Sequence, residues 1–148
     1  CAYCKLKLKR EALDTLKKKL GTPMGRQSKG VPQSFQADAW RSQSSLTGLE
    51  ASLAAARTVW EGVDNKGLRG LLPSEQKPLA DKIDAAYAAS LNLFASNQRS
   101  LTEMLNDDAG RQQLNDIYDS LNVVHRLHEG ELAKALGIQL GFNANDGD

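Results

Sequence analysis

Apolar residues recur every three or four positions along most of the chain, which is the spacing of one face of an α-helix. The first such stretch predicts a helix from about Tyr3 to Leu20. Its apolar face is formed by leucines at helical spacing: Leu6, Leu13, Leu16 and Leu20. Gly21 is predicted to end this helix and Pro23 to prevent its continuation, so that the stretch from Gly21 to Pro32 becomes a loop.

Three further stretches show the same spacing and predict three more main helices. They cover about Ser45–Trp60, Pro78–Ser96 and a segment from Asp107 or Asp108 to Leu136, which Gly137 closes. Ser44 or Ser45 is suited to cap the second helix, and a shorter helical piece is predicted at Ser34–Arg41. The inward positions that we expect in one core are Leu53, Trp60, Ile83, Tyr87, Phe94, Ile117 and Leu121. Leucines of the loop Gly62–Pro73 are expected to tuck onto the bundle: Leu68, Leu71 and Leu72.

No stretch alternates apolar and polar residues as a half-buried strand does. Long amphipathic helices joined by polar loops are typical of an antiparallel bundle. The sequence therefore predicts an all-α fold, an antiparallel bundle of about four main helices. We expect residues 1–148 to form a single bundle, with 137–148 as a docked C-terminal tail in which Phe142 is buried.

The composition agrees with a globular domain, since 41% of the 148 residues are hydrophobic and 25% are charged. No apolar run approaches the roughly 18 residues that cross a bilayer, so no transmembrane segment is predicted. Residues 1–30 hold nine basic and two acidic residues, a net charge of +7 in a chain whose total is +1. A basic helix can bind nucleic acid or anionic lipid, but no aromatic residues interleave with these charges as single-strand binders require. We therefore expect a solvated face and no nucleic-acid partner.

One candidate metal cluster stands out, formed by His125, His128 and Glu129. On a helix His125 neighbours both other residues, so their ligand atoms could converge on one ion. The order differs from the His-Glu-x-x-His of zinc peptidases. The alternative is that both histidines pack in the core, because they continue the apolar stripes of their helix.

A second candidate is a ligand or cleft site formed by Asp38, Arg41, Ser42 and Ser45. A guanidinium, two hydroxyls and the free amides at a helix start would together bind an anion or carboxylate. The alternative is a simple helix start, with serine caps and Arg41 paired to Asp38. The sequence leaves both open.

The two cysteines, Cys1 and Cys4, are weak evidence for a metal site. One Cys-x-x-Cys pair supplies half of a zinc site, and no second pair exists. No arrangement of nucleophile, base and acid is recognisable, so no catalytic residue is assigned.

Three further segments are distinctive: Leu20–Gly25, then Ala39–Leu46, and the closing run Leu136–Asp148. Together they resemble the imelysin-like family, which has glycine where this chain has Gln43. The resemblance implies a cell-envelope or periplasmic protein, from a precursor that can be lipid-anchored, with a role in iron uptake; some classify the family as metallopeptidases. It also implies a domain about twice this length, built from two helical halves, of which this chain is the C-terminal one. The family's Gly-x-His-x-x-Glu signature belongs to the other half and does not occur here.

From this resemblance we expect a non-enzymatic envelope module linked to uptake of iron or another metal. Its expected partners are the N-terminal half of the same protein and other envelope proteins, with iron or zinc as the metal of the intact protein. Two alternatives stay open. One is a zinc-dependent peptidase completed by the missing half, and the other is a structural bundle whose basic first helix docks a partner.

Overall fold

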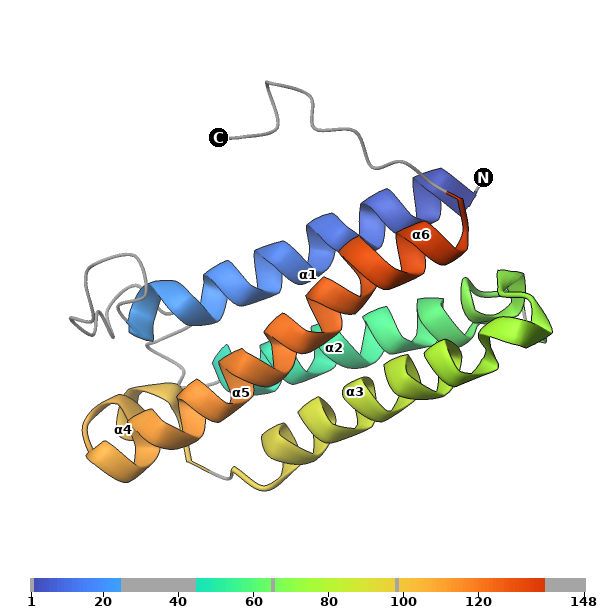
Figure 1. The fold of residues 1–148 in the computed structure, drawn as a ribbon. Coiled ribbons are helices and arrows are strands. Elements are labelled where there is room, and N and C mark those ends of the chain that lie inside the picture. Colours follow the sequence, from blue (N-terminus) through green and yellow to red (C-terminus); the bar gives the residue numbers. More distant parts are fainter. Residues whose placement is uncertain (1, 25–44, 65, 98, 138–148) are drawn as a thin grey trace.

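The computed structural model describes residues 2–24, 45–64, 66–97 and 99–137. Regular structure in this part of the chain is helical throughout, without a strand. Four long helices lie side by side (Figure 1): α1 (Ala2–Met24), α2 (Ser45–Glu61), α3 (Lys77–Ala95) and α5 (Asp108–Arg126). They form a closed ring of contacts, from α1 to α2, α3, α5 and back to α1. The predicted all-α bundle is confirmed.

Neighbouring helices run in opposite directions. In Figure 1, α1 and α3 run one way along the bundle, and α2 and α5 run the other way. Lys5 near the start of α1 donates a hydrogen bond to the Lys66 carbonyl beyond the end of α2, with 3.4 Å between Nζ and O. The bundle is therefore antiparallel, as the sequence predicts.

The apolar stripes of the sequence form one continuous core. All seven positions named above as its inward set are buried in a single cluster that draws on every long helix. The leucines of the α1 stripe are also buried, with at most 4% of their surface exposed. No helix in the described ranges is both long enough and apolar enough to span a membrane.

The predicted end of the first helix is wrong. Helix α1 continues through Gly21 and Pro23 to Met24. Leu20 and Gly21 are both buried, so packing favours continuing the helix past them. A proline in the last turn removes only one backbone hydrogen bond, which is too little to end a helix that the core holds. The predicted piece Ser34–Arg41 lies outside the described residues.

The connections hold short helical turns that the sequence did not reveal. Two 3₁₀ turns, Arg69–Leu71 and Ser74–Gln76, lead into α3. Leu68 is buried and Leu72 partly buried, but Leu71 is 49% exposed, so the prediction for Leu71 is wrong. It lies at the end of a 3₁₀ turn, where side chains three residues apart are eclipsed and only one side faces the core.

A short helix, α4 (Leu101–Leu105), closes one end of the bundle before α5 (Figure 1). The Ser100 side chain caps it by accepting a hydrogen bond from the Glu103 amide. Asp107 caps α5 by accepting from the Gly110 amide, which confirms the predicted start of this helix.

Beyond α5 the helix continues with a wider turn. Residues Leu127–Leu132 form a π-helical segment, η4, which passes into α6 (Ala133–Ala135). Gly137 has a φ of 66°, the left-handed conformation that commonly ends a helix and that the sequence predicts there. The tail from 138 onward, with Phe142, lies outside the described residues.

Candidate functional site

The predicted cluster of Asp38, Arg41, Ser42 and Ser45 lies at the edge of the described residues. The first three fall within the segment 25–44, and only the backbone of Ser45 is described, as the first residue of α2. The location of this helix start is confirmed. The proposed role of the four side chains stays a prediction.

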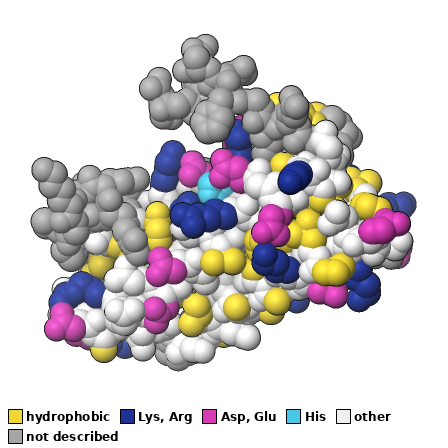
Figure 2. Space-filling model, in the orientation of Figure 1, with side chains coloured by type: hydrophobic (Ala, Val, Ile, Leu, Met, Phe, Trp, Pro, Cys, Tyr) yellow, Lys and Arg dark blue, Asp and Glu magenta, His cyan; other side chains and the backbone are white. Residues whose placement is uncertain are grey.

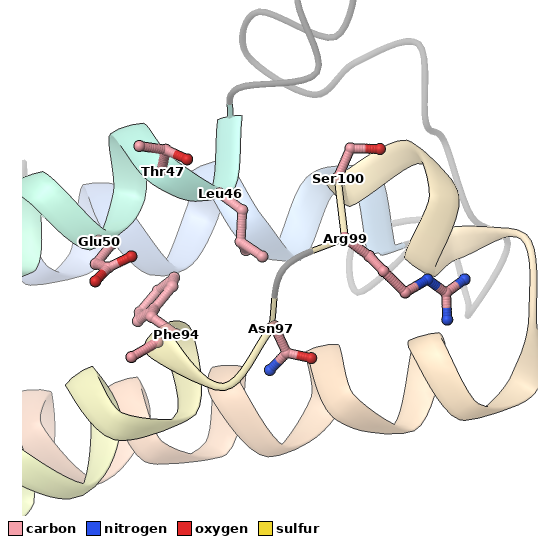
Figure 3. A pocket seen from close by; sticks show the side chains of 8 residues that line it. Leu46, Thr47, Glu50, Phe94, Asn97, Arg99 and Ser100 are labelled. Atoms are coloured by element: carbon pink, nitrogen blue, oxygen red, sulfur yellow. The ribbon is translucent and has the colours of Figure 1, made fainter.

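A polar pocket of about 330 Å³ adjoins this same helix start (Figure 3). Leu46 and Thr47 line it from α2, Phe94 lines it from the end of α3, and Asn97 lines it from just beyond that end. Other lining residues are Glu50, Ala95, Arg99 and Ser100. Leu46 directly follows Ser45, so the first turn of α2 lies at this pocket.

The charged groups of the pocket differ in how they are held. The Arg99 guanidinium extends away from α2 in Figure 3, donates to the Glu103 carbonyl at 3.0 Å and pairs with Asp107. This pairing raises the pKa of Arg99 and lowers the pKa of Asp107, mainly through the hydrogen bond between the two side chains. Glu50 contributes a carboxylate from α2. The lining of the pocket is therefore mainly polar.

The candidate metal residues do not converge. His125 approaches Lys17, with 3.1 Å between Nδ1 and Nζ, and its Nε2 lies 3.9 Å from the Glu129 carboxylate. His128 instead points into the core, where Nε2 lies 2.8 Å from the Tyr87 hydroxyl. Among the described residues no group of three or more His, Cys, Asp and Glu side chains is placed to hold a metal ion.

His125 lies at the edge of the surface. It is 8% exposed, and the surface of Figure 2 has a small histidine area among acidic and basic side chains. Burial is the main cause that lowers its pKa, and the Lys17 charge lowers it further. Near neutral pH the ring is therefore uncharged and accepts a hydrogen bond from Lys17, so its approach to Glu129 is not an ion pair.

A buried polar chain crosses the core, and the sequence did not predict it. Lys9 of α1 donates to the Ala56 carbonyl of α2 and to the Tyr87 hydroxyl of α3, which lies 3.0 Å away. Tyr87 in turn bonds to His128 of η4. Lys9 is 3% exposed, and Tyr87 and His128 are fully buried. This polar chain, Lys9–Tyr87–His128, connects α1, α2, α3 and the segment η4 that follows α5.

Burial has a large effect on the acid–base properties of this polar chain. It lowers the pKa of Lys9 from 10.5 to about 7, although Glu61 opposes the change. It also lowers the pKa of His128 to about 3, and the nearby Lys9 charge adds to this effect. The pKa of Tyr87 is raised by the same cause. Within the polar chain, only Lys9 therefore changes its charge near neutral pH.

A π-helical turn begins at the residue before His128. Leu127 and Leu132, and likewise His128 and Ala133, are all buried and are five residues apart. That is the hydrogen-bonding interval of a π-helix, whereas an α-helix has an interval of four. Single π turns inside α-helices are rare and occur often at functional sites. The Nδ1 atom of His128 is buried and has no hydrogen-bond partner in the described part of the chain.

Trp60 connects the polar chain to an ion pair at the surface. Its ring centroid lies 5.7 Å from that of His128. Its indole nitrogen donates to Asp84 at 2.8 Å, and Arg69 pairs with the same carboxylate at 3.0 Å. The loop before α3 and the helices α2 and α3 are thereby held together beside His128.

Comparison with known families identifies the chain. The family model described as imelysin (Peptidase_M75) matches residues 6–128. The chain belongs to the imelysin family. This match confirms the resemblance and spans the imelysin core from α1 to η4, including Lys9, Tyr87 and His128. No curated protein and no solved structure matches the chain significantly.

Proposed function

We propose that this imelysin chain is a binding module of a cell-envelope protein that takes part in uptake of iron or another metal. The observation that carries the proposal is the family match over residues 6–128. In this proposal the module acts with an N-terminal helical half of the same protein in the periplasm or envelope, and its precursor can be lipid-anchored.

The polar pocket at the start of α2 is the proposed contribution of this half to a cleft between the halves. It combines the carboxylate of Glu50, the hydroxyl of Thr47 and the amide of Asn97 with the first turn of a 17-residue helix. The amides of a first helical turn lack partners within the helix and attract negative charge. A metal ion held by a carboxylate-bearing ligand fits such a set, because Glu50 can bind the metal while Arg41 and the first turn of α2 attract the ligand's carboxylate.

A binding role is favoured over catalysis by the position of the two histidines. A catalytic zinc site keeps one coordination position open to water or substrate. His128 is fully buried and His125 is 8% exposed, so neither is well placed for a site that takes up a peptide. The peptidase alternative therefore needs its metal ligands from the other half.

Calorimetric titration with the citrate complexes of ferrous iron, ferric iron and zinc tests the proposal, first on this chain and then on a protein with both halves. We expect binding by the two-half protein that Arg41→Ala and Glu50→Gln each weaken about tenfold or more. Arg57→Ala is the matched control, since Arg57 lies on α2 and pairs with Glu61, away from the pocket.

Each alternative has its own outcome. Metal-dependent, chelator-sensitive cleavage of a protein substrate by the two-half protein would establish the peptidase and overturn a purely binding role. If no metal binds and none of the three variants differs from the parent, the chain is a structural interaction bundle and the proposal is wrong.

A further inference from the structure

The polar chain Lys9–Tyr87–His128 has more than one way to distribute its protons. A charged lysine ammonium has three donors and no acceptor, whereas a neutral amine also offers one lone pair. A tyrosine hydroxyl has a single proton to donate. The charge on Lys9 therefore limits the direction in which the hydrogen bonds of the polar chain can run.

When Lys9 is charged, only one direction is available. Lys9 donates a hydrogen bond to the Tyr87 oxygen, and the Tyr87 hydroxyl donates a hydrogen bond to the Nε2 atom of His128. A neutral histidine that accepts at Nε2 carries its proton on Nδ1. That N–H is then buried without an acceptor, because Nδ1 has no partner among the described residues.

When Lys9 is neutral, the direction can reverse. Tyr87 then donates to the amine lone pair of Lys9 and accepts from an Nε2–H of His128, which leaves a lone pair on Nδ1. Buried N–H groups without a partner are rarer in proteins than acceptors whose capacity is only partly used. The reversed arrangement is therefore the stable one once Lys9 has lost its proton, while Lys9 still donates to the Ala56 carbonyl.

We propose that Lys9, Tyr87 and His128 form a proton-coupled switch, in which the charge on Lys9 decides which ring nitrogen of His128 carries the proton. An ammonium proton of Lys9 passes to the Tyr87 oxygen as the Tyr87 proton passes to Nε2 of His128. The proton on Nδ1 is then released to water during a local opening. One proton leaves, Lys9 becomes neutral, Tyr87 stays protonated and His128 changes tautomer. The switch is independent of the proposed function.

The charges around the switch place its midpoint near neutral pH. Glu61 of α2 faces Lys9 and favours the charged amine, whereas burial disfavours it and brings the pKa of Lys9 to about 7. Burial lowers the pKa of His128 to about 3, and Lys9 of α1 and His125 of α5 lower it further, so this ring stays neutral while Lys9 titrates. Asp84 of α3 is already engaged by Trp60 and Arg69.

The consequence lies in the π-helical segment η4. At a pH below the midpoint of the switch, Nδ1 of His128 is a hydrogen-bond donor without a partner in the core. At a pH above the midpoint, the same atom is an acceptor without a partner. The stability of the wide turn Leu127–Leu132, which leads to the end of the chain through α6, therefore depends on the charge of a lysine on α1.

Nitrogen-15 NMR of the histidine rings in the full chain, from pH 5 to 9, tests the switch. His125→Gln leaves His128 as the one remaining histidine, and its ring nitrogens report the tautomer directly. We expect a change from Nδ1–H to Nε2–H with a midpoint near pH 7, and the Nζ resonance of Lys9 should titrate with the same midpoint.

Two variants separate the switch from a buried histidine that titrates alone. In Lys9→Met the tautomer should stay constant across the range. In Tyr87→Phe Lys9 should still titrate, but His128 should no longer follow it. Lys5→Met is the matched control, because Lys5 lies one turn away on α1 and is exposed, and it should behave as the parent protein does.

The His125→Gln chain alone decides the outcome if the core variants do not fold. A single tautomer from pH 5 to 9 in that chain overturns the proposal. A tautomer change that persists unaltered in folded Tyr87→Phe or Lys9→Met also overturns it. Neither result bears on metal binding by the two-half protein, which calorimetry measures separately.

Discussion

The two ends of the bundle core are built from different chemistry. The end closed by α4 is apolar, and the side chains that fill it include Leu46, Phe94, Leu101, Met104 and Leu114. Toward the other end the core also has buried apolar side chains, such as Leu6 and Ile83, but it includes Lys9, Tyr87, His128 and the indole of Trp60, which hydrogen bond to one another or to neighbouring groups. The long helices run through both ends, whereas α4 belongs to the first end and η4 to the second.

The difference separates two sources of stability. In the apolar end, removal of hydrocarbon from water stabilises the fold, so another apolar side chain of similar volume can replace the one present at little cost. In the polar end, burial of an amine and an imidazole costs free energy that their hydrogen bonds offset only in part. Stability should therefore depend on packing volume at one end and on pH at the other.

The largest expected effect is the pH dependence that Lys9 confers. The pKa of Lys9 is about 7 in the folded chain, against 10.5 for a lysine in an unfolded one, so between these values the unfolded chain binds more protons. The free energy of unfolding therefore rises with pH across this window. Below pH 7 Lys9 is charged in both states, so it adds no pH dependence there. Each unit of difference between the folded and unfolded pKa values corresponds to about 1.4 kcal/mol. The total rise in the free energy of unfolding is therefore at most about 5 kcal/mol.

Urea denaturation at pH values from 6 to 10 measures this effect. We expect Lys9→Met to remove most of the rise and to stabilise the chain at pH 6 by about 1–4 kcal/mol, as apolar replacements of buried charges often do. Lys5→Met should keep the rise. Equal pH profiles for Lys9→Met and the parent would show that Lys9 is not buried as an amine.

The next largest effect is expected in the apolar stripe of α2. Leu53 is fully buried, so Leu53→Ala removes its transfer free energy and leaves a cavity, at a cost of about 2–5 kcal/mol. Chemical denaturation at one pH measures it. Leu8→Ala is the control, since Leu8 is 67% exposed and should change stability by about 0.5 kcal/mol or less. If Leu53→Ala lowered the free energy of unfolding by well under 1 kcal/mol, this stripe would be exposed to solvent and the prediction would be wrong.

A smaller effect is expected where the polar end meets the surface. Asp84→Asn weakens the charge-assisted bonds to Trp60 and Arg69, and since this carboxylate is about one-third exposed we expect a cost of about 1–2 kcal/mol. Trp60 fluorescence, measured in a Trp40→Phe background, should change as well. Asp81→Asn is the control because Asp81 is more exposed. Identical effects of the two variants would contradict the role of Asp84.

The smallest effect is expected at the cap of α4. Ser100→Ala removes the acceptor for the Glu103 amide and should cost about 1 kcal/mol. Thr102→Ala, on the same short helix but away from its cap, serves as the comparison. Thermal melts of the two variants with the same midpoint would show that the cap contributes nothing.

The sequence predicted the helices whose stripes are unbroken and whose ends carry clear caps. Helices α2 and α5 begin where Ser45 and Asp107 indicate, and the predicted core is confirmed. The end of α1 was missed because burial of Leu20 and Gly21 outweighs the local effect of Pro23. Helix α4 was missed because five residues are too few to show a period.

The polar chain was missed for a different reason. Lys9 lies three residues after Leu6 and four before Leu13, on the apolar stripe itself, and this position was the available signal. A lysine there is ordinarily exposed, and its burial depends on Ala56 and Tyr87, which are 47 and 78 residues away. For His125 and His128 the sequence left a metal site and packing in the core both open. His128 lies in the core beside Tyr87, four residues after the buried Val124, and His125 lies at the edge of the core.

The polar chain also determines the axial register of the helices. The apolar face of α1 consists of leucines, so a slide of this helix by one turn, about 5.4 Å, would exchange one leucine contact for another at little cost. The same slide would carry the Lys9 amine away from both of its acceptors and leave it without partners in an apolar environment. Comparable slides of α3 or η4 would break the bond between Tyr87 and His128. Among many alignments with similar packing, the hydrogen bonds of one buried lysine select a single one.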